Sequence, residues 1–254
     1  MAGDKTRPSA FITGTSSGIG HALSHYYLSE GWIVYGLSRR CSEDLETYEH
    51  FHHQSIDLRE ANGFSERFLD ILPHGQTVDL VVLNAGVLGH FGDVRETTIE
   101  NLQETMMVNV WANKVIFDEL RRREVALRQV VAISSGASVN GNRGWSGYSI
   151  SKAALNMFVK LLAAENPRVH FSSLAPGLVD TEIQETLCNL PIDERFPALE
   201  VLRSKRHTPE MPSAEEAAIL LAKVIRELPD QCASGDYVDI RKLAARNDNS
   251  RATR

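Results

Sequence analysis

The chain has 254 residues, of which 43% are hydrophobic and 24% charged, and its formal net charge is −6. This length and apolar content suit one α/β domain with a sizeable core and argue against a disordered chain. The acidic balance argues against a nucleic-acid-binding surface. The cysteines, Cys41, Cys188 and Cys232, are too few and too widely spaced for a disulfide framework or a metal-ligand cluster, so we expect no metal site.

The N-terminal segment and the apolar runs bear on location. The segment Met-Ala-Gly-Asp-Lys-Thr-Arg-Pro has no apolar centre of the kind that secretory signals carry. No apolar stretch approaches the length needed to cross a bilayer. We therefore expect a cytoplasmic protein whose partners include neither membrane nor nucleic acid.

Strands and helices are predicted to alternate along the chain. The first half is predicted to form a strand at Ala10–Thr13, a helix from Gly18 to Gly31, strands at Trp32–Leu37 and Ser55–Leu58, a helix at Gly63–Leu72, a strand at Leu80–Leu83 and a long helix at Thr97–Arg123. The second half is predicted to form a strand at Gln129–Ser134, a helix at Ser146–Ala164, a strand at Val169–Ala175, a helix at Ser213–Leu228 and a strand at Tyr237–Ile240. This alternation is typical of a Rossmann-type, doubly wound parallel sheet of about seven strands with helices on both faces.

The C-terminal third holds a segment of different composition. Pro, Arg and Glu are frequent at 186–213, which predicts an irregular insertion, and we expect a substrate lid around 182–211. The helix that follows has Ser213 as N-cap and Glu216 three residues later, a capping-box pattern. We predict a single catalytic domain over residues 1–243 and a disordered polar tail over 244–254.

A glycine-rich turn follows the first predicted strand. Its spacing is Gly14-x-x-x-Gly18-x-Gly20, with Ser16, Ser17 and Ile19 between the glycines. Glycines allow the backbone to approach a pyrophosphate, and the helix N-terminus after them supplies free N–H donors. A tight strand-to-helix connection is the alternative interpretation. The position at the start of a βαβ unit favours dinucleotide binding.

The end of the second strand bears on the choice between NAD and NADP. An acid there would bind a ribose hydroxyl, whereas a basic residue would meet a 2′-phosphate. The chain has Ser38-Arg39-Arg40 and no acid before Glu43. We expect Arg39 to select NADP(H), since a guanidinium pairs well with a phosphate dianion. The alternative is that both arginines are ordinary surface charges.

Tyr148 and Lys152 are four residues apart and would share one face of a helix. A nearby ammonium favours the phenolate, so the pair would suit acid–base catalysis. Ser135 ends the fifth predicted strand, where open α/β sheets bind ligands, and its hydroxyl could hold a substrate oxygen. Taken alone, the pair could be a surface helix contact, and Ser-Ser-Gly a common turn.

The motifs in order resemble the short-chain dehydrogenase/reductase family. The matching residues are Thr13-Gly14-x-x-x-Gly18-x-Gly20, Asn84-Ala85-Gly86, Asn109, Ser135, Tyr148-x-x-x-Lys152 and Pro176-Gly177, over roughly residues 9–240. Two departures are visible. Leu83 stands where many members have a first asparagine, and a Gly-Gly ending is missing.

The resemblance implies roles for these residues. Tyr148 would exchange a proton with the substrate oxygen, Ser135 would hold that oxygen, Lys152 would bind the nicotinamide ribose and lower the pKa of Tyr148, and Asn109 would hold a water linking Lys152 to solvent. The other implied cofactor contacts are those of the glycine turn, Asp57, Leu58, Asn84, Ala85, Gly86, Pro176, Gly177, Val179 and Thr181.

The ending Ser234–Arg241 is more similar to the sepiapterin reductase and benzil reductase branch, which would make Asp239 a substrate anchor. We expect an NADPH-dependent carbonyl reductase of diketones or sepiapterin-like compounds, with Trp145 beside Leu88 and Phe91 in an apolar pocket. Packing at the start of a helix is an equally good interpretation of Trp145. Alternatives are a non-catalytic NADP(H)-sensing or scaffolding protein on the same fold and a 3-oxoacyl thioester reductase.

The resemblance also implies a homo-oligomer, which we expect to be a dimer, formed through the helices at 97–123 and 146–164. Several apolar side chains could belong either to the core or to this interface: Tyr26, Tyr27, Met106, Met107, Trp111 and Phe117.

Overall fold

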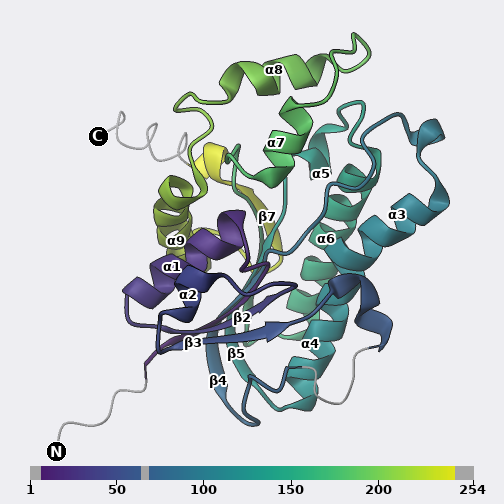
Figure 1. Cartoon of the computed structure of the whole chain (residues 1–254). Helices are drawn as coiled ribbons and strands as arrows, with labels where there is room; N and C mark the ends of the chain where they lie inside the picture. The colour runs from purple at the N-terminus through teal and green to yellow at the C-terminus, as the bar shows by residue number, and fades with distance from the viewer. Residues whose placement is uncertain (1–6, 64–68, 244–254) are drawn as a thin grey trace, which may run out of the picture.

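A computed structural model describes residues 7–63 and 69–243, and it contains one parallel sheet (Figure 1). The order of the seven strands is β3-β2-β1-β4-β5-β6-β7, and every neighbouring pair is parallel. The strands are β1 Ser9–Thr13, β2 Ile33–Ser38, β3 Phe51–Ser55, β4 Thr77–Leu83, β5 Ala126–Ile133, β6 His170–Ala175 and β7 Asp236–Asp239. The predicted doubly wound sheet of seven strands is confirmed. Its strand order reverses between β1 and β4, where such sheets open a crevice at their carboxyl edge.

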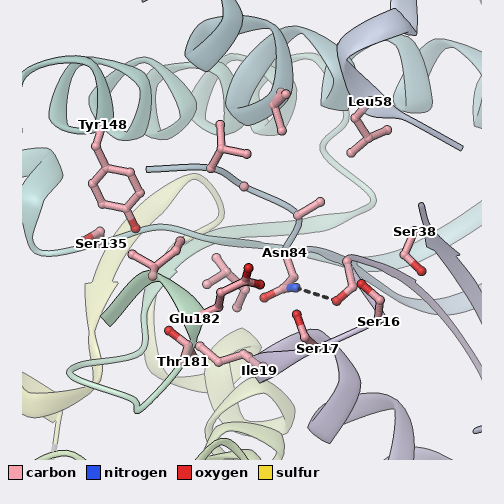
Figure 2. Close-up of a pocket in the computed structure, with 18 of the residues that line it drawn as sticks. Ser16, Ser17, Ile19, Ser38, Leu58, Asn84, Ser135, Tyr148, Thr181 and Glu182 are labelled. Atoms are coloured by element: carbon pink, nitrogen blue, oxygen red, sulfur yellow. Dashed lines mark hydrogen bonds between the residues drawn. The ribbon is translucent and has the colours of Figure 1, made fainter. Parts of the chain in front are cut away.

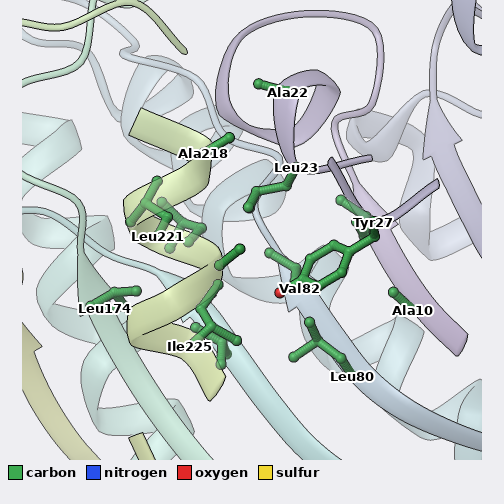
Figure 3. Packing of buried hydrophobic residues seen from close by; sticks show 14 of the residues in the cluster. Ala10, Ala22, Leu23, Tyr27, Leu80, Val82, Leu174, Ala218, Leu221 and Ile225 are labelled. Atoms are coloured by element: carbon green, nitrogen blue, oxygen red, sulfur yellow. The ribbon is translucent and has the colours of Figure 1, made fainter. Parts of the chain in front are cut away.

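Helices cover both faces of the sheet (Figure 1). The α-helices are α1 Gly18–Ser29, α2 Glu43–Glu46, α3 Ile99–Met106, α4 Ala112–Arg122, α5 Ala137–Asn140, α6 Ser146–Glu165, α7 Glu182–Cys188, α8 Pro197–Lys205 and α9 Ala214–Gln231. On one face, Leu221 and Ile225 of α9 pack beside Leu23 and Tyr27 of α1 and against Val82 of β4 (Figure 3). On the other face, α4 and α6 bury a second apolar cluster. The predicted capping box of α9 is present, because Ser213 and Glu216 exchange both hydrogen bonds.

The third predicted strand was placed wrongly. It lies at Phe51–Ser55, whereas the prediction was Ser55–Leu58. The observed strand pairs only with β2 at one edge of the sheet and consists of half-buried and exposed residues, with none fully buried. An edge strand of this kind needs no continuous apolar run, so the search for such a run missed it.

The structure describes the two ends of the predicted helix at Gly63–Leu72, and neither end is α-helical. Residues up to Gly63 form the 3₁₀ helix η1, Leu58–Gly63, and Leu69 begins a turn with a positive φ of 63°. Residues 64–68 lie outside the described part of the chain, as does the tail predicted at 244–254.

The predicted long helix at Thr97–Arg123 is interrupted by a π-helical turn. This turn, η3, covers Met107–Trp111 and joins α3 to α4. A short 3₁₀ helix, η2, at Val94–Glu96, precedes α3. Single π turns are frequent at functional sites, and this one contains Asn109. Among the side chains that the sequence could not assign to core or interface, Tyr27 and Phe117 lie in the core, whereas Trp111 is 46% exposed.

The segment predicted to be an irregular insertion contains two helices. They are α7 and α8, and Pro197 occupies the first turn of α8, where a proline is well tolerated. Their apolar faces form a third cluster above the sheet, whose buried members are Leu88, Trp145, Leu187, Phe196, Leu199, Leu202 and Met211. The irregular structure predicted for 186–213 is therefore wrong at 186–188 and 197–205, which are helical, whereas the residues between and after these helices form turns and loops. Among the described residues, no helix is long and apolar enough to span a membrane.

Candidate active site

One pocket lies along the carboxyl edge of the sheet, where the strand order reverses (Figure 2). It collects residues from the ends of β1, β2, β4, β5 and β6, from η1, α6 and the start of α7. Its lining includes Gly14, Ser16, Ser17, Gly18, Ile19, Ser38, Arg39, Asp57, Leu58, Asn84, Ala85, Gly86, Ser135, Tyr148, Lys152, Pro176, Gly177, Val179 and Thr181. Most residues predicted to bind a cofactor therefore surround one cavity.

The glycine turn forms the floor of this pocket and has little room for side chains. Gly14 and Gly18 have positive φ angles of 76° and 58°. A Cβ on Gly20 would lie 2.3 Å from the Gly14 carbonyl oxygen. A Cβ on Gly18 would lie 3.3 Å from the Thr181 methyl group, which faces the turn from across the pocket. The turn thus has the close backbone approach that a pyrophosphate site requires.

Asn84 ties the end of β4 to the end of β1. Its side-chain amide donates to the Thr13 carbonyl at 2.9 Å and, at 3.4 Å, to that of Gly14. The Thr13 hydroxyl accepts from the backbone N–H groups of Asn84 and Ala85. Gly86 follows at a crowded point, where a Cβ would lie 3.4 Å from Lys152 Nζ. Asn84 is therefore a structural residue that lines the pocket.

The ends of β2 and β3 carry charged groups of both signs. Arg39 is exposed on the pocket wall, and among the described residues its guanidinium has no hydrogen-bond or ion-pair partner. The Arg59 guanidinium hydrogen-bonds to Asp57 and thereby holds the pKa of that carboxyl below its usual range. Ser38 is buried, donates to the Arg40 carbonyl at 2.8 Å and fixes the bend that carries Arg39.

Tyr148 and Lys152 project from α6 towards the pocket. Lys152 is only 3% exposed, and its Nζ donates to the Ile133 carbonyl at 2.7 Å. Nζ lies 5.7 Å from the centre of the Tyr148 ring. Burial lowers the pKa of Lys152 from 10.5 to about 8. The predicted pairing across one helical turn is thus observed.

Ser135 lies at the end of β5, and the Tyr148 hydroxyl points towards it (Figure 2). Burial raises the pKa of Tyr148, whereas a hydrogen bond from Ser135 lowers it. The Ser135 oxygen accepts from the Ala137 backbone N–H at 3.1 Å, so its own proton remains available for Tyr148 or for a ligand oxygen. The arrangement provides a phenol, a hydroxyl and a buried cation around one point of the pocket.

Asn109 is fully buried behind Lys152. Its amide nitrogen donates to the Val87 carbonyl and to Ser151 Oγ, each at 2.9 Å, and its Oδ1 accepts from the Val87 N–H at 2.8 Å. Its backbone carbonyl accepts from the Asn113 amide at 2.9 Å. The side chain is thus used to hold the loop after β4, and it does not line the pocket.

Two predicted substrate residues lie outside the pocket lining. Trp145 is buried in the third cluster, where its ring meets Phe91 edge to face with the centroids 4.8 Å apart. Asp239 is buried, and both its oxygens accept from Arg241, at 2.9 Å from Nε and 2.6 Å from Nη2. The sequence prediction did not foresee this ion pair, although the two residues are only two apart.

Sequence reasoning missed several lining residues, three of which come from α7. Glu182, Ile183 and Gln184 line the pocket, and the Glu182 carboxylate points inward towards Asn84 (Figure 2). The missed signal was Thr181 followed by an acid, a pattern typical of a helix start. Other missed lining residues are Leu37, Ile56, Arg59, Val87, Glu104, Val108, Ile133 and Ser134.

The doubly wound fold and the pocket at its carboxyl edge define a class, the α/β oxidoreductases that bind a nicotinamide dinucleotide at the strand-order reversal. Residues 8–189 match the family model of the short chain dehydrogenases, so the chain belongs to that family.

Relatives and solved structures agree with this assignment. The chain is 31% identical over 186 residues to "Benzil reductase ((S)-benzoin forming)" of Bacillus subtilis, covering 69% of this chain and 76% of the relative. It is 29% identical over 252 residues to the Saccharomyces cerevisiae benzil reductase IRC24, covering 89% and 93%. The crystal structure of the S. cerevisiae short chain dehydrogenase/reductase YIR035C superposes with a TM-score of 0.77 at 25% identity, over 92% and 96% of the two chains. A 4-hydroxyisoleucine dehydrogenase in complex with NADH shares the fold at a TM-score of 0.72 and 20% identity, over 92% and 96%.

Proposed function

We propose that the chain is an NADP(H)-dependent carbonyl reductase of small dicarbonyl compounds, the substrate class for which the similar benzil reductases are named. The observation that carries the proposal is the convergence of Ser135, Tyr148 and Lys152 at one end of a pocket. The glycine turn lies at the other end. A dinucleotide lying along this pocket would bring its nicotinamide to the hydroxyl groups.

Tyr148, Ser135 and Lys152 have separate roles in the proposed proton transfer. A bound nicotinamide supplies the hydride to the carbonyl carbon. The Tyr148 hydroxyl donates its proton to the carbonyl oxygen, which Ser135 holds by a hydrogen bond. The Lys152 ammonium stabilises the phenolate that remains. With a pKa of about 8, Lys152 is still mostly cationic at pH 7. Asn109 would act indirectly, by holding the loop after β4 and a water beside Lys152.

The cofactor contacts would follow the lining of the pocket. Gly14 and Gly18 would receive the pyrophosphate, with Gly20 outside the lining at a point where no side chain fits, and Asp57 and Leu58 would meet the adenine. We propose NADP(H) over NAD(H) because Arg39 is exposed on the pocket wall and its guanidinium makes no hydrogen bond or ion pair with the residues that the structure describes. The remaining contacts would come from Ser16, Ser17, Ile19, Asn84, Ala85, Gly86, Pro176, Gly177, Val179 and Thr181.

The Asp239–Arg241 ion pair favours a dicarbonyl over a pterin. A pterin held by Asp239 would have to displace the Arg241 guanidinium from both carboxylate oxygens. Such charge-assisted pairs are the stronger hydrogen bonds of proteins. The apolar cluster around Trp145, with Ile183 and Leu178 packed against it, offers aromatic or aliphatic substituents a contact surface. We propose that the segment 182–211 closes over the substrate, within one catalytic domain spanning residues 1–243.

We also propose a homodimer formed by the helices around η3 and α6. Their outer face exposes large apolar side chains, namely Trp111, Ile150, Met157 and Leu161. Exposed apolar residues grouped on neighbouring helices are typical of association surfaces. The three cysteines are unpaired, which fits the reducing conditions of the proposed cytoplasmic location.

The test is reduction of benzil with NADPH or NADH by the wild type and by Tyr148→Phe. Loss of the phenolic proton should lower kcat by about 100-fold or more, because general acid catalysis is worth that much, while NADPH binding persists. Tyr48→Phe is the matched control, since the Tyr48 hydroxyl bonds to His25 away from the pocket. Full activity of Tyr148→Phe would refute the mechanism. Tight NADPH binding without turnover on any carbonyl would indicate a sensor or scaffold, and a preference for an acetoacetyl thioester would indicate a 3-oxoacyl reductase.

A further inference from the structure

A chain of side-chain hydrogen bonds connects α6 to the loop that carries Ser135. Ser134 Oγ donates to Asn156 Oδ1 at 2.6 Å, and Asn156 Nδ2 donates to Ser138 Oγ at 2.9 Å. Ser138 Oγ in turn donates to the Ser135 carbonyl at 2.7 Å. The chain begins and ends on residues adjacent to or within the proposed site, yet Asn156 and Ser138 do not line the pocket.

The direction of these bonds is fixed by the number of protons. Ser138 has one hydroxyl proton and gives it to the Ser135 carbonyl, so it must accept from Asn156. Asn156 must therefore turn its NH₂ towards Ser138 and its oxygen towards Ser134. An amide is the side chain that can donate at one end and accept at the other, whereas a carboxylate of the same shape cannot.

Asn156 lies in register with the reactive residues of α6. It follows Lys152 by four residues and Tyr148 by eight, so the three side chains form one row along the helix. The helix itself is anchored in the core by Leu155, Val159 and Leu162, which lie further along the same side. The fold therefore does not need the Asn156 amide in order to place α6.

The other hydrogen bonds near Ser135 come from the sheet and from the start of α5, where the Ala137 N–H donates to the Ser135 hydroxyl oxygen at 3.1 Å. The Ser134 backbone N–H still bonds to the Leu174 carbonyl at the end of the sheet, at 2.8 Å. Beyond it, the Ser135 carbonyl accepts from the Ser138 N–H at 3.0 Å and, over a longer 3.4 Å, from the Tyr237 hydroxyl. Displacement of a reacting group by about 1 Å can cost about 100-fold in rate. The bracing of this loop therefore bears directly on the Ser135 hydroxyl.

We propose that Asn156 is a positioning residue, which acts through Ser138 to fix the Ser135 hydroxyl against Tyr148. The expected effect on kcat rests on the proposed function. The hydrogen-bond geometry does not, and it can be tested in protein that turns over no substrate. Tyr148, Lys152 and Asn156 then lie on one helix, α6, and the clamp formed by Asn156 and Ser138 of α5 links that helix to Ser135. Through this clamp, α6 contributes to the distance between the proton donor and the oxygen-binding hydroxyl.

The kinetic test uses Asn156→Leu, Asn156→Asp, Ser138→Ala and Ser138→Thr, each also made in a Ser135→Ala background. Loss of the amide or of the Ser138 hydroxyl should lower kcat with benzil about tenfold, while the KM for NADPH stays within about twofold. Asn156→Asp should lower kcat as much as Asn156→Leu, although aspartate has the shape of asparagine. Ser138→Thr should retain activity because it keeps the hydroxyl. Asn166→Leu, at the far end of α6, is the matched control.

Measurements in the Ser135→Ala background separate positioning from general damage. There the Asn156 and Ser138 substitutions should produce no further loss of kcat, because the residue they position is gone. A further loss of kcat as large as the loss seen in the wild-type background would overturn the proposal. An unchanged kcat in Asn156→Leu would overturn it too.

A second readout needs no turnover. The pKa of Tyr148, measured by NMR on protein labelled at the tyrosine ring, should rise in Asn156→Leu because the Ser135 hydrogen bond weakens. In Ser135→Ala, the Asn156 substitution should leave that pKa unchanged. If the wild type reduces no carbonyl but the pKa of Tyr148 shifts as described, the proposed function fails and the clamp stands. If the pKa does not shift, the clamp fails whatever the activity.

Discussion

Replacing Lys152 by methionine should make the protein more stable while abolishing its proposed activity. Lys152 is almost fully buried, and burial lowers its pKa from 10.5 to about 8. At about 1.4 kcal/mol per pKa unit, keeping it charged at pH 7 costs the folded state about 3 kcal/mol. Lys152→Met removes this cost but also the bond to the Ile133 carbonyl, worth about 1 kcal/mol. We expect a net gain of about 2 kcal/mol at pH 7, or a Tm higher by about 5 °C.

The sign of the pH dependence follows from the direction of the shift. Below pH 8 the lysine is protonated in both folded and unfolded chains, so the full cost is present. Between about 8 and 10.5 the folded protein has lost the proton that the unfolded chain still binds, so wild-type stability rises with pH. The advantage of Lys152→Met should therefore shrink by more than half between pH 7 and pH 9.5.

The assay for this prediction is denaturant unfolding without cofactor at both pH values, followed by circular dichroism. Lys160→Met, at an exposed lysine of the same helix, should change stability little at either pH. A Lys152→Met protein no more stable than the wild type at pH 7 would refute the reasoning. So would an advantage that stays constant as the pH rises.

Two further predictions concern the cofactor. Arg39→Ala should raise the KM for NADPH about tenfold and leave that for NADH nearly unchanged, because one charge-assisted contact to a 2′-phosphate is lost; an equal rise for both cofactors in steady-state kinetics would remove Arg39 from cofactor selection. Glu182→Gln should tighten NADPH binding about threefold in fluorescence titration, since its carboxylate points into the pocket where phosphates would lie (Figure 2). Weaker binding would mean that Glu182 makes a favourable contact instead.

The sequence predicts the fold best where strands are buried on both faces. The ends of β4 and β5 are continuous apolar runs, so their existence could be predicted from hydrophobicity alone. The edge strand β3, with the residues Phe-His-His-Gln-Ser, carries no such run and was misplaced. The helices α7 and α8 were missed because their composition is polar and the apolar cluster that stabilises them is formed with distant residues such as Leu88 and Trp145.

The site was predictable to the extent that its residues occur in short motifs. Tyr148 and Lys152 share a helix, and the glycines share one turn, so spacing alone brings them together. Spacing does not show which residues from distant parts of the chain contact a side chain. Trp145 was predicted at the substrate and is packed under the lid helices, and Asp239 was predicted as an anchor and is paired with Arg241. The π turn at Asn109 likewise has no sequence pattern that marks it.

The helix α6 explains why the reactive groups can be both polar and well positioned. A buried lysine and a half-buried phenol are costly to hold, and a loop of low stability would let them move. Here Leu155, Val159 and Leu162 anchor the helix in the core, further along the side from which Tyr148 and Lys152 project. The apolar contacts of α6 thus keep Tyr148 and Lys152 in fixed positions. Ser135, on the loop before α5, is held by hydrogen bonds, and one chain of these bonds runs through Asn156 of the same helix.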